Sequence, residues 1–214
     1  MELTLRYKGP LPAVGTDRRV REKHQIRQEL SGQLAAYWEQ SRRLKTLFAD
    51  VKNLQIVKRS SDQFVVDRPL IDETKFWWRW PLCGYDFVPL VTQILKAHVE
   101  LKMRLYRKNQ GILFEGGDLH NRLKTFFDAL QVPKDASQVP TDPSVSADPK
   151  EWPPLFCLLD NDNLVTKLSI ESFKLLTKVP DEFAGVQNYV ELDLDVVIHP
   201  ITPMMGTIDM LFKG

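Results

Sequence analysis

Two short polar stretches of this chain could together form a site for phosphodiester hydrolysis. The residues that could do chemistry are Asp118, His120, Asn121, Lys124 and Asp128 in the first stretch, and Asp160 and Asp162 in the second. Carboxylates on separate elements can hold a divalent metal against a phosphate, and a nearby lysine can stabilise the developing negative charge. Mg²⁺ suits such a site, because it binds a few carboxylate oxygens and keeps several waters.

Each of these residues also has an ordinary structural explanation. Asp118 follows two glycines, at a position typical of a helix N-cap. His120, Lys124 and Asp128 share one helix face, on which the last two could form an i,i+4 ion pair. The sequence around Asp160 is rich in Asp and Asn, which favour turns before strands. Spacing alone therefore leaves open both a metal site and a set of caps and ion pairs.

Apolar periodicity predicts the elements that must position these residues. Strands are predicted at 2–7, 63–66, 98–106, 164–168 and 189–198, and helices at 17–47, with Asp17 as N-cap, and at 119–130. Residues 87–96 fit either a strand or a short helix. Because strands and a few helices occur without regular βαβ alternation, we expect an α+β fold in which helices pack a mixed β-sheet.

Length and composition are those of an ordinary globular protein. A chain of 214 residues, 43% hydrophobic and 27% charged, fits one large domain or two small ones. Residues 131–154 contain six of the 14 prolines, which predicts an exposed loop. We expect no membrane association, since no apolar run is long enough to span a bilayer. Two cysteines without Cys-x-x-Cys spacing predict a cytoplasmic protein.

Charge is distributed unevenly along the chain. Residues 1–130 hold 23 Lys and Arg against 15 Asp and Glu, whereas residues 131–214 hold 6 against 13. A basic portion can follow a nucleic-acid backbone, although the two portions could equally attract each other within the fold. The candidate phosphate contacts are Arg18, Arg19, Arg21, Lys23, Arg27, Arg104, Arg107 and Lys108. The acidic face of the last predicted strand, Glu191, Asp193 and Asp195, would repel DNA, so we expect it to point away from the site or to pair with the basic helix.

The order of these motifs resembles that of the RusA-like Holliday junction resolvases. A strand precedes Gly-Asp-Leu-His-Asn-Arg-Leu-Lys-Thr-Phe-Phe-Asp-Ala-Leu, and Asn-Asp-Asn-Leu-Val follows after a loop. The pattern of that family is Asp-x-Asp-Asn-x-x-Lys-x-x-x-Asp-Ala-Leu, followed later by Asp-Asp-x-x-Val. The resemblance covers roughly residues 97–198. It implies a single RusA-like domain over 1–214, with 131–154 as an insertion loop relative to compact members.

The resemblance also implies roles for individual residues. Asp118, Lys124 and Asp162 match catalytic positions, Asp128 matches the Asp of Asp-Ala-Leu, and Asn161 replaces the Asp that precedes Asp162. The implied protein is a Mg²⁺-dependent endonuclease, with Mn²⁺ as the alternative metal. It would act as a homodimer on branched DNA such as Holliday junctions.

His120 is the main departure from the family pattern, because it stands where the family has its second catalytic Asp. An imidazole removes one negative charge and is a poorer ligand for Mg²⁺ than for Mn²⁺ or Zn²⁺. Three hypotheses remain open at this point. The chain is an active nuclease with Asp118, His120 and Asp162 as metal ligands, a structure-selective DNA-binding protein with impaired catalysis, or an α+β interaction protein whose charged clusters are caps and ion pairs.

Overall fold

The computed structural model describes residues 1–11, 16–41, 80–93, 97–108, 119–140, 152–186 and 188–200. Its elements in chain order are β1 (Glu2–Pro10), α1 (Thr16–Gln40), β2 (Trp80–Leu82), β3 (Tyr85–Val91), β4 (Ala97–Arg107), α3 (Leu119–Leu130), η1 (Ala136–Gln138), β5 (Pro154–Leu159), η3 (Asp162–Leu164), β6 (Val165–Lys174), η4 (Asp181–Phe183) and β7 (Tyr189–Pro200). Two mixed sheets packed with helices confirm the predicted α+β fold.

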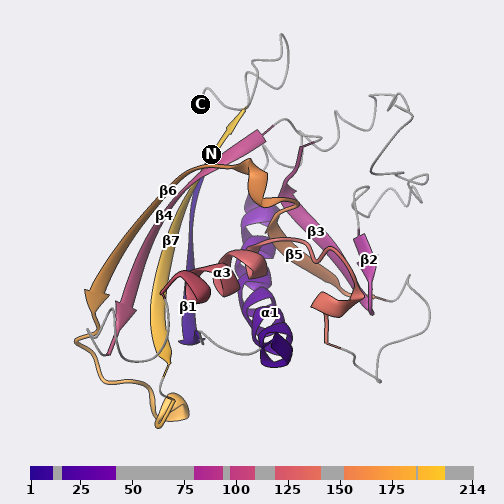
Figure 1. Cartoon of the computed structure of the whole chain (residues 1–214). Coiled ribbons are helices and arrows are strands. Elements are labelled where there is room, and N and C mark those ends of the chain that lie inside the picture. Colours follow the sequence, from indigo (N-terminus) through magenta and orange to yellow (C-terminus); the bar gives the residue numbers. More distant parts are fainter. Residues whose placement is uncertain are drawn as a thin grey trace, which may run out of the picture.

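The two sheets lie on either side of α1 (Figure 1). The larger sheet has the strand order β1-β7-β4-β6, in which only the β4–β6 pair is parallel. The smaller sheet has the order β2-β3-β5, with β3 and β5 parallel. Ile26, Leu30 and Leu34 of α1 are buried in a hydrophobic core that contains residues of both sheets. This helix is therefore the central packing element of the described fold.

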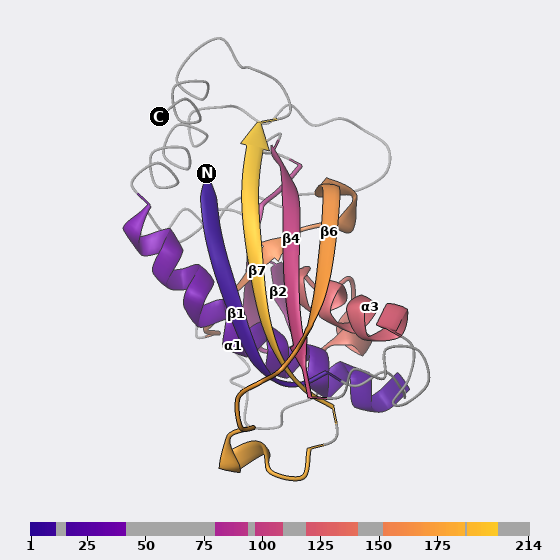
Figure 2. The same cartoon turned by 90° about the vertical axis from the view of Figure 1, so that its left-hand side faces the viewer.

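The helices lie behind one face of the larger sheet, and the other face is turned away from them (Figure 2). Alternate residues of β4 and β7 are buried against the helices, as the period-2 pattern predicts. On the opposite face, Glu191, Asp193 and Asp195 pair with Lys8, Arg6 and Arg104 at 3.3, 3.5 and 3.0 Å. The acidic face thus finds its partners on β1 and β4 rather than on the basic helix.

Several element boundaries differ from the sequence predictions. The first strand continues to Pro10, and α1 begins at Thr16, so Asp17 lies within its first turn rather than at its N-cap. The ambiguous segment around 87–96 forms strand β3. Strands β2 and β5 were not predicted. The predicted strand at 63–66 and the end of the first helix, residues 42–47, lie outside the described residues.

The prolines of 131–154 do not make the whole segment an exposed loop. Val132 and Val139 are buried, in a small core cluster with Phe87, Leu155 and Cys157. Between them, Asp135 caps η1 by accepting a hydrogen bond from the Ser137 amide at 2.9 Å. Pro154 begins β5. The expectation of a fully exposed loop is therefore wrong at both ends of the segment, and residues 141–151 lie outside the described residues.

Candidate functional site

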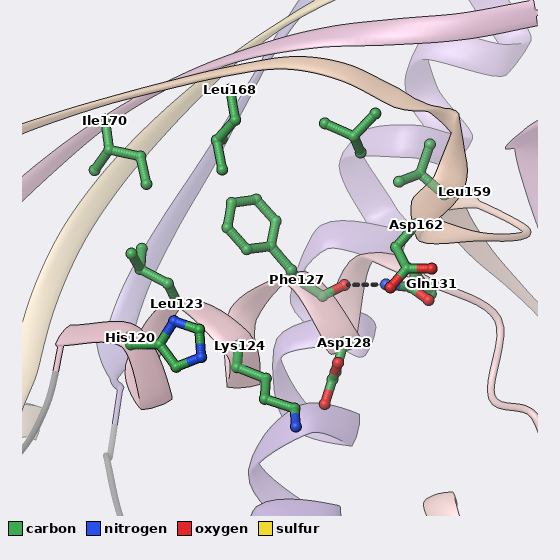
Figure 3. Close-up of a pocket in the computed structure, with 11 residues that line it drawn as sticks. His120, Leu123, Lys124, Phe127, Asp128, Gln131, Leu159, Asp162, Leu168 and Ile170 are labelled. Atoms are coloured by element: carbon green, nitrogen blue, oxygen red, sulfur yellow. Dashed lines mark hydrogen bonds between the residues drawn. The ribbon is translucent and has the colours of Figure 1, made fainter.

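A pocket of about 510 Å³ lies between α3 and β6, with its polar side chains drawn from the two predicted motifs (Figure 3). His120, Lys124 and Asp128 come from α3, and Asp162 comes from η3. The other lining residues are Leu123, Phe127, Gln131, Leu159, Val165, Leu168 and Ile170. Four of the residues singled out from the sequence therefore converge on one cavity, although 34 positions separate Asp128 from Asp162.

The amphipathic pattern of α3 explains how it serves both the core and the pocket. Phe126, Ala129 and Leu130 are buried in the main core. His120, Lys124 and Asp128 recur every four residues and so lie along one side of the helix. Leu123 and Phe127 lie between these two faces and point toward Leu168 and Ile170 across the pocket (Figure 3). The pocket therefore has a mostly apolar wall and a charged rim.

Backbone pairing at the end of β5 holds the two motifs together. Gln131, directly after α3, forms a parallel bridge with Leu159, and the Val132 amide donates to the Leu159 carbonyl at 3.0 Å. The Asp160 amide donates to the Val91 carbonyl at 3.1 Å, which ties the same strand end to β3. Asn161 then caps η3 by accepting from the Asn163 amide at 2.9 Å. This cap confirms the predicted Asx-rich turn and presents Asp162 at the pocket.

Asp128 forms an ion pair with a residue of the N-terminal helix. Its carboxylate pairs with Lys23 of α1 at 2.5 Å. The sequence suggested an i,i+4 ion pair between Lys124 and Asp128 instead. Helix spacing could not predict Lys23 as the partner, because it belongs to another helix. Asp128 therefore anchors α3 to α1 at the edge of the pocket, and Asp162 is the more exposed of the two pocket carboxylates.

Asp160 has a structural role beside the pocket rather than a place in its lining. One carboxylate oxygen accepts a hydrogen bond from the Gln93 amide at 3.1 Å. Burial raises the pKa of this carboxyl above its ordinary value, and hydrogen bonds from backbone amides partly offset that effect. These contacts join the turn after β3 to the turn after β5. Asn121 likewise lies outside the pocket lining, on the same helix as Lys124.

The predicted phosphate contacts separate into several groups. Arg27 is buried, and it donates to the backbone carbonyls of Asp128, Gln131 and Gln138 at 3.0–3.2 Å, so its assignment to DNA binding is wrong. Arg104 pairs through one guanidinium nitrogen with both oxygens of Asp195, on the face of the sheet away from the pocket.

The remaining basic residues are positioned differently. Arg107 donates to the Ser172 hydroxyl at 3.1 Å, and Lys23 pairs with Asp128. Arg21 and Lys108 are exposed. Arg18 and Arg19 belong to the first turns of α1, and their side chains are outside the described set. The predicted phosphate contacts whose side chains are described therefore divide among buried, paired and exposed positions.

A magnesium ion fits this pocket only in part. Asp162 is an exposed carboxylate, and His120 and Asp128 line the same cavity. Among the described residues, no three His, Cys, Asp or Glu side chains lie close enough to hold a metal ion together. Asp118, the first carboxylate of the motif, lies outside the described residues. Because Mg²⁺ often binds through only one or two carboxylates and completes its shell with water and phosphate, Asp162 is compatible with one edge of such a site.

Comparison with known proteins adds no assignment. No family model, no curated protein and no solved structure matches this chain. In the described helices, no segment is long and apolar enough to cross a membrane.

The sequence predicted the polar side of the pocket, and it missed part of the apolar side. Leu159 belongs to β5, which was not predicted, and Ile170 lies beyond the end of the strand predicted at 164–168. A signal was present, because Leu155–Leu159 is a continuous apolar run bounded by Pro154 and Asp160. Such a run is typical of a strand buried on both faces.

Proposed function

We propose that the pocket between α3 and β6 is the active site of a RusA-like, metal-dependent endonuclease that cuts branched DNA. The observation that supports this proposal is the convergence of His120, Lys124 and Asp162 on one cavity. These residues come from the two motifs on which the family resemblance rests, and η1 and β5 are the described elements between those motifs. A homodimer in the cytoplasm, with Mg²⁺ or Mn²⁺ as cofactor, belongs to the same proposal.

Each residue has a distinct part in the proposed reaction. Asp162, with Asp118, would hold the metal ion, and His120 would be a third ligand. When bound, the ion would polarise the scissile phosphate and lower the pKa of a water molecule. Lys124 would place its ammonium group beside the phosphate and stabilise the negative charge that develops there. Asp128, paired with Lys23, would position the helix that carries His120 and Lys124.

Labelled four-way DNA junctions, incubated with Mg²⁺, Mn²⁺ or neither, test the proposal, with binding and cleavage measured separately. We expect Asp162→Asn to abolish metal-dependent cleavage and Lys124→Ala to lower its rate by at least about 100-fold, while junction binding persists. Asp181→Asn is the matched control, because Asp181 is an exposed carboxylate of η4 that pairs with Lys178 and does not line the pocket. Equal cleavage by the parent, Asp162→Asn and Lys124→Ala would exclude the assignment.

A second candidate is a structure-selective DNA-binding protein with impaired catalysis. His120 supports it, since this imidazole lines the pocket at the position of the family's second catalytic Asp. The discriminating variant is His120→Asp, which restores a carboxylate on an exposed residue. If the parent binds junctions without cutting them and His120→Asp cuts with Mg²⁺, the second candidate is correct. Cleavage by the parent with either metal would rule it out.

A further inference from the structure

The two edges of the larger sheet differ in whether other elements hydrogen-bond to their backbone groups. At the β1 edge, α1 satisfies backbone groups with side chains. The Arg6 and Lys8 amides donate to Gln33 and Glu29 at 2.9 and 3.2 Å, and Gln33 donates back to the Arg6 carbonyl at 2.6 Å. At the other edge, β6 pairs only with β4 in the described part of the chain. An unpaired strand edge is a template for pairing with another chain.

Strand β6 carries charged side chains, but it is neither short nor interrupted, so its backbone edge stays open to pairing. It is ten residues long and contains neither proline nor glycine. Leu168 and Phe173 on this strand are 45% and 43% exposed, and Leu176, two residues beyond it, is 87% exposed. These are three of the four large hydrophobic side chains exposed in the described residues. Exposed apolar side chains along an open edge indicate a surface that is covered by a partner.

The charges and apolar residues of β6 are arranged so that the strand is complementary to itself. Its register with β4 places Leu168 and Ile170 beside buried Leu101 and Met103, on the pocket side of the sheet. Lys167 and Glu171 lie on the other side, beside Glu100 and Arg104. Ser169 is midway between the two charged residues and midway between the two apolar residues.

We propose that β6 pairs antiparallel with β6 of a second copy of this chain, with Ser169 on the two-fold axis. In this register Lys167 faces the partner subunit's Glu171, and Leu168 faces the partner subunit's Ile170. Each contact occurs twice, because a two-fold interface uses the same surface on both copies. A shift of two residues in either direction places Lys167 opposite the partner's Ser169 or the partner's Phe173, and both charge pairs are lost.

The proposed interface extends the charge network that each copy already has. Lys167 pairs with Glu100 at 3.2 Å, and Glu171 pairs with Lys102 at 3.2 Å. Adding the partner's Glu171 beside Lys167 creates a row of alternating charges across the two-fold axis. On the opposite side of the sheet, the partner's Ile170 extends the apolar wall that Leu168 contributes to the pocket. Both pockets then open on the same face of one continuous sheet.

Charge reversal at the interface provides a test that is specific to this register. Lys167→Glu places two glutamates opposite each other, and Glu171→Lys places two lysines opposite each other. We expect the parent to sediment as a dimer in analytical ultracentrifugation, and each variant alone to dissociate at least about tenfold more readily. An equimolar mixture of the two variants should form a heterodimer, since acidic and basic strands then face each other at both positions.

A control and a cross-link complete the experiment. Lys8→Glu makes the same charge change on β1, at the opposite edge of the sheet, and should leave the dimer intact. Ser169→Cys should form an intermolecular disulfide on mild oxidation, because the two cysteines meet on the axis. Ser172→Cys should not, since it faces the partner's Thr166. A monomeric parent, or variants that dimerise like the parent, would overturn the inference.

The proposed dimer deepens the homodimer that forms part of the proposed function, but the two can fail separately. Sedimentation and cross-linking measure association without DNA or metal. A β6-paired dimer that leaves junctions uncut would preserve the interface and exclude the nuclease. Conversely, cleavage by a protein that remains monomeric would preserve the nuclease and exclude the interface.

Discussion

Arg27 shows how a charged residue can serve the protein interior rather than a ligand. It is 1% exposed, and its guanidinium group donates to three backbone carbonyls around the end of α3 and η1. Burial lowers the pKa of Arg27 from its ordinary value, while Cys157 and Asp128 act in the opposite direction. A fixed array of five donors suits arginine to joining several acceptors at once. Arg27 therefore fixes the position of the helix that carries the pocket's polar residues.

Replacing Arg27 should destabilise the fold much more than replacing an exposed arginine of the same helix. We expect Arg27→Met to lower the free energy of unfolding by about 3 kcal/mol, because three carbonyls lose a charged donor in a buried site. Arg21→Met is the control and should change it by less than about 0.5 kcal/mol, since Arg21 is exposed. Urea denaturation measures both. Similar values for the two variants would contradict the structural role of Arg27.

His24 should make the stability depend on pH. Burial, with a contribution from nearby Arg27, lowers the pKa of His24 from 6.5 to about 4 in the folded chain. Between these values the unfolded chain binds a proton that the folded chain does not. The contribution of neutral His24 to the free energy of unfolding is therefore fully present above about pH 6.5, and it is lost as the pH falls toward 4.

The variant His24→Leu isolates this effect. The parent should lose about 1–2 kcal/mol more than the variant between neutral pH and pH 4, after allowance for solvent screening. Denaturation at a series of pH values measures the difference, and the carboxylates common to both proteins cancel. Parallel stability curves for the two proteins would show that His24 does not titrate as expected.

At the scale of elements, α1 contains a glycine that its structure does not require. Gly32 is exposed in the helix interior, and a Cβ atom built there would meet nothing within 4 Å. We expect Gly32→Ala to raise the free energy of unfolding by about 0.5–1 kcal/mol, because alanine loses less conformational freedom in a helix. Thermal or urea denaturation measures the change.

Gly185 provides a control with the same change in a different backbone conformation. A Cβ atom there also meets open space, but Gly185 has a φ angle of +90°, which L-residues rarely adopt. Gly185→Ala should therefore destabilise the protein by about 1 kcal/mol. If both substitutions changed stability in the same direction, backbone conformation would not be the deciding factor.

The elements also show what the sequence could and could not predict. β4, α3 and β7 were predicted because each has a clear apolar period that matches its burial. β5 was missed because a strand buried on both faces has no period to detect. Arg27 was misassigned because the sequence shows its charge but not its partners, which are more than 100 residues away. The polar rim of the pocket followed from two motifs, whereas its apolar wall depends on how β6 pairs with β4.

At the scale of the whole molecule, basic residues from the first part of the chain form ion pairs with acidic residues from the last part. Basic residues of β1 and β4 face acidic residues of β7 and β6 across the outer surface of the larger sheet. Such exposed pairs contribute little to stability individually. They nevertheless leave that surface with mixed charge, so we expect the proposed DNA substrate to bind on the pocket side, where Lys124 lies.

The pairing of β1 with β7 has a consequence for how this protein is made. These are the first and last of the described strands, and Glu2 is aligned with Val197. During synthesis, β1 leaves the ribosome first, and it cannot pair with β7 until nearly all of the described chain has been translated. Contacts so distant in sequence slow folding, and unpaired apolar strands are prone to aggregate in the meantime. The larger sheet therefore cannot be completed before β7 has been translated, and β1 lacks its only strand partner in the described fold until then.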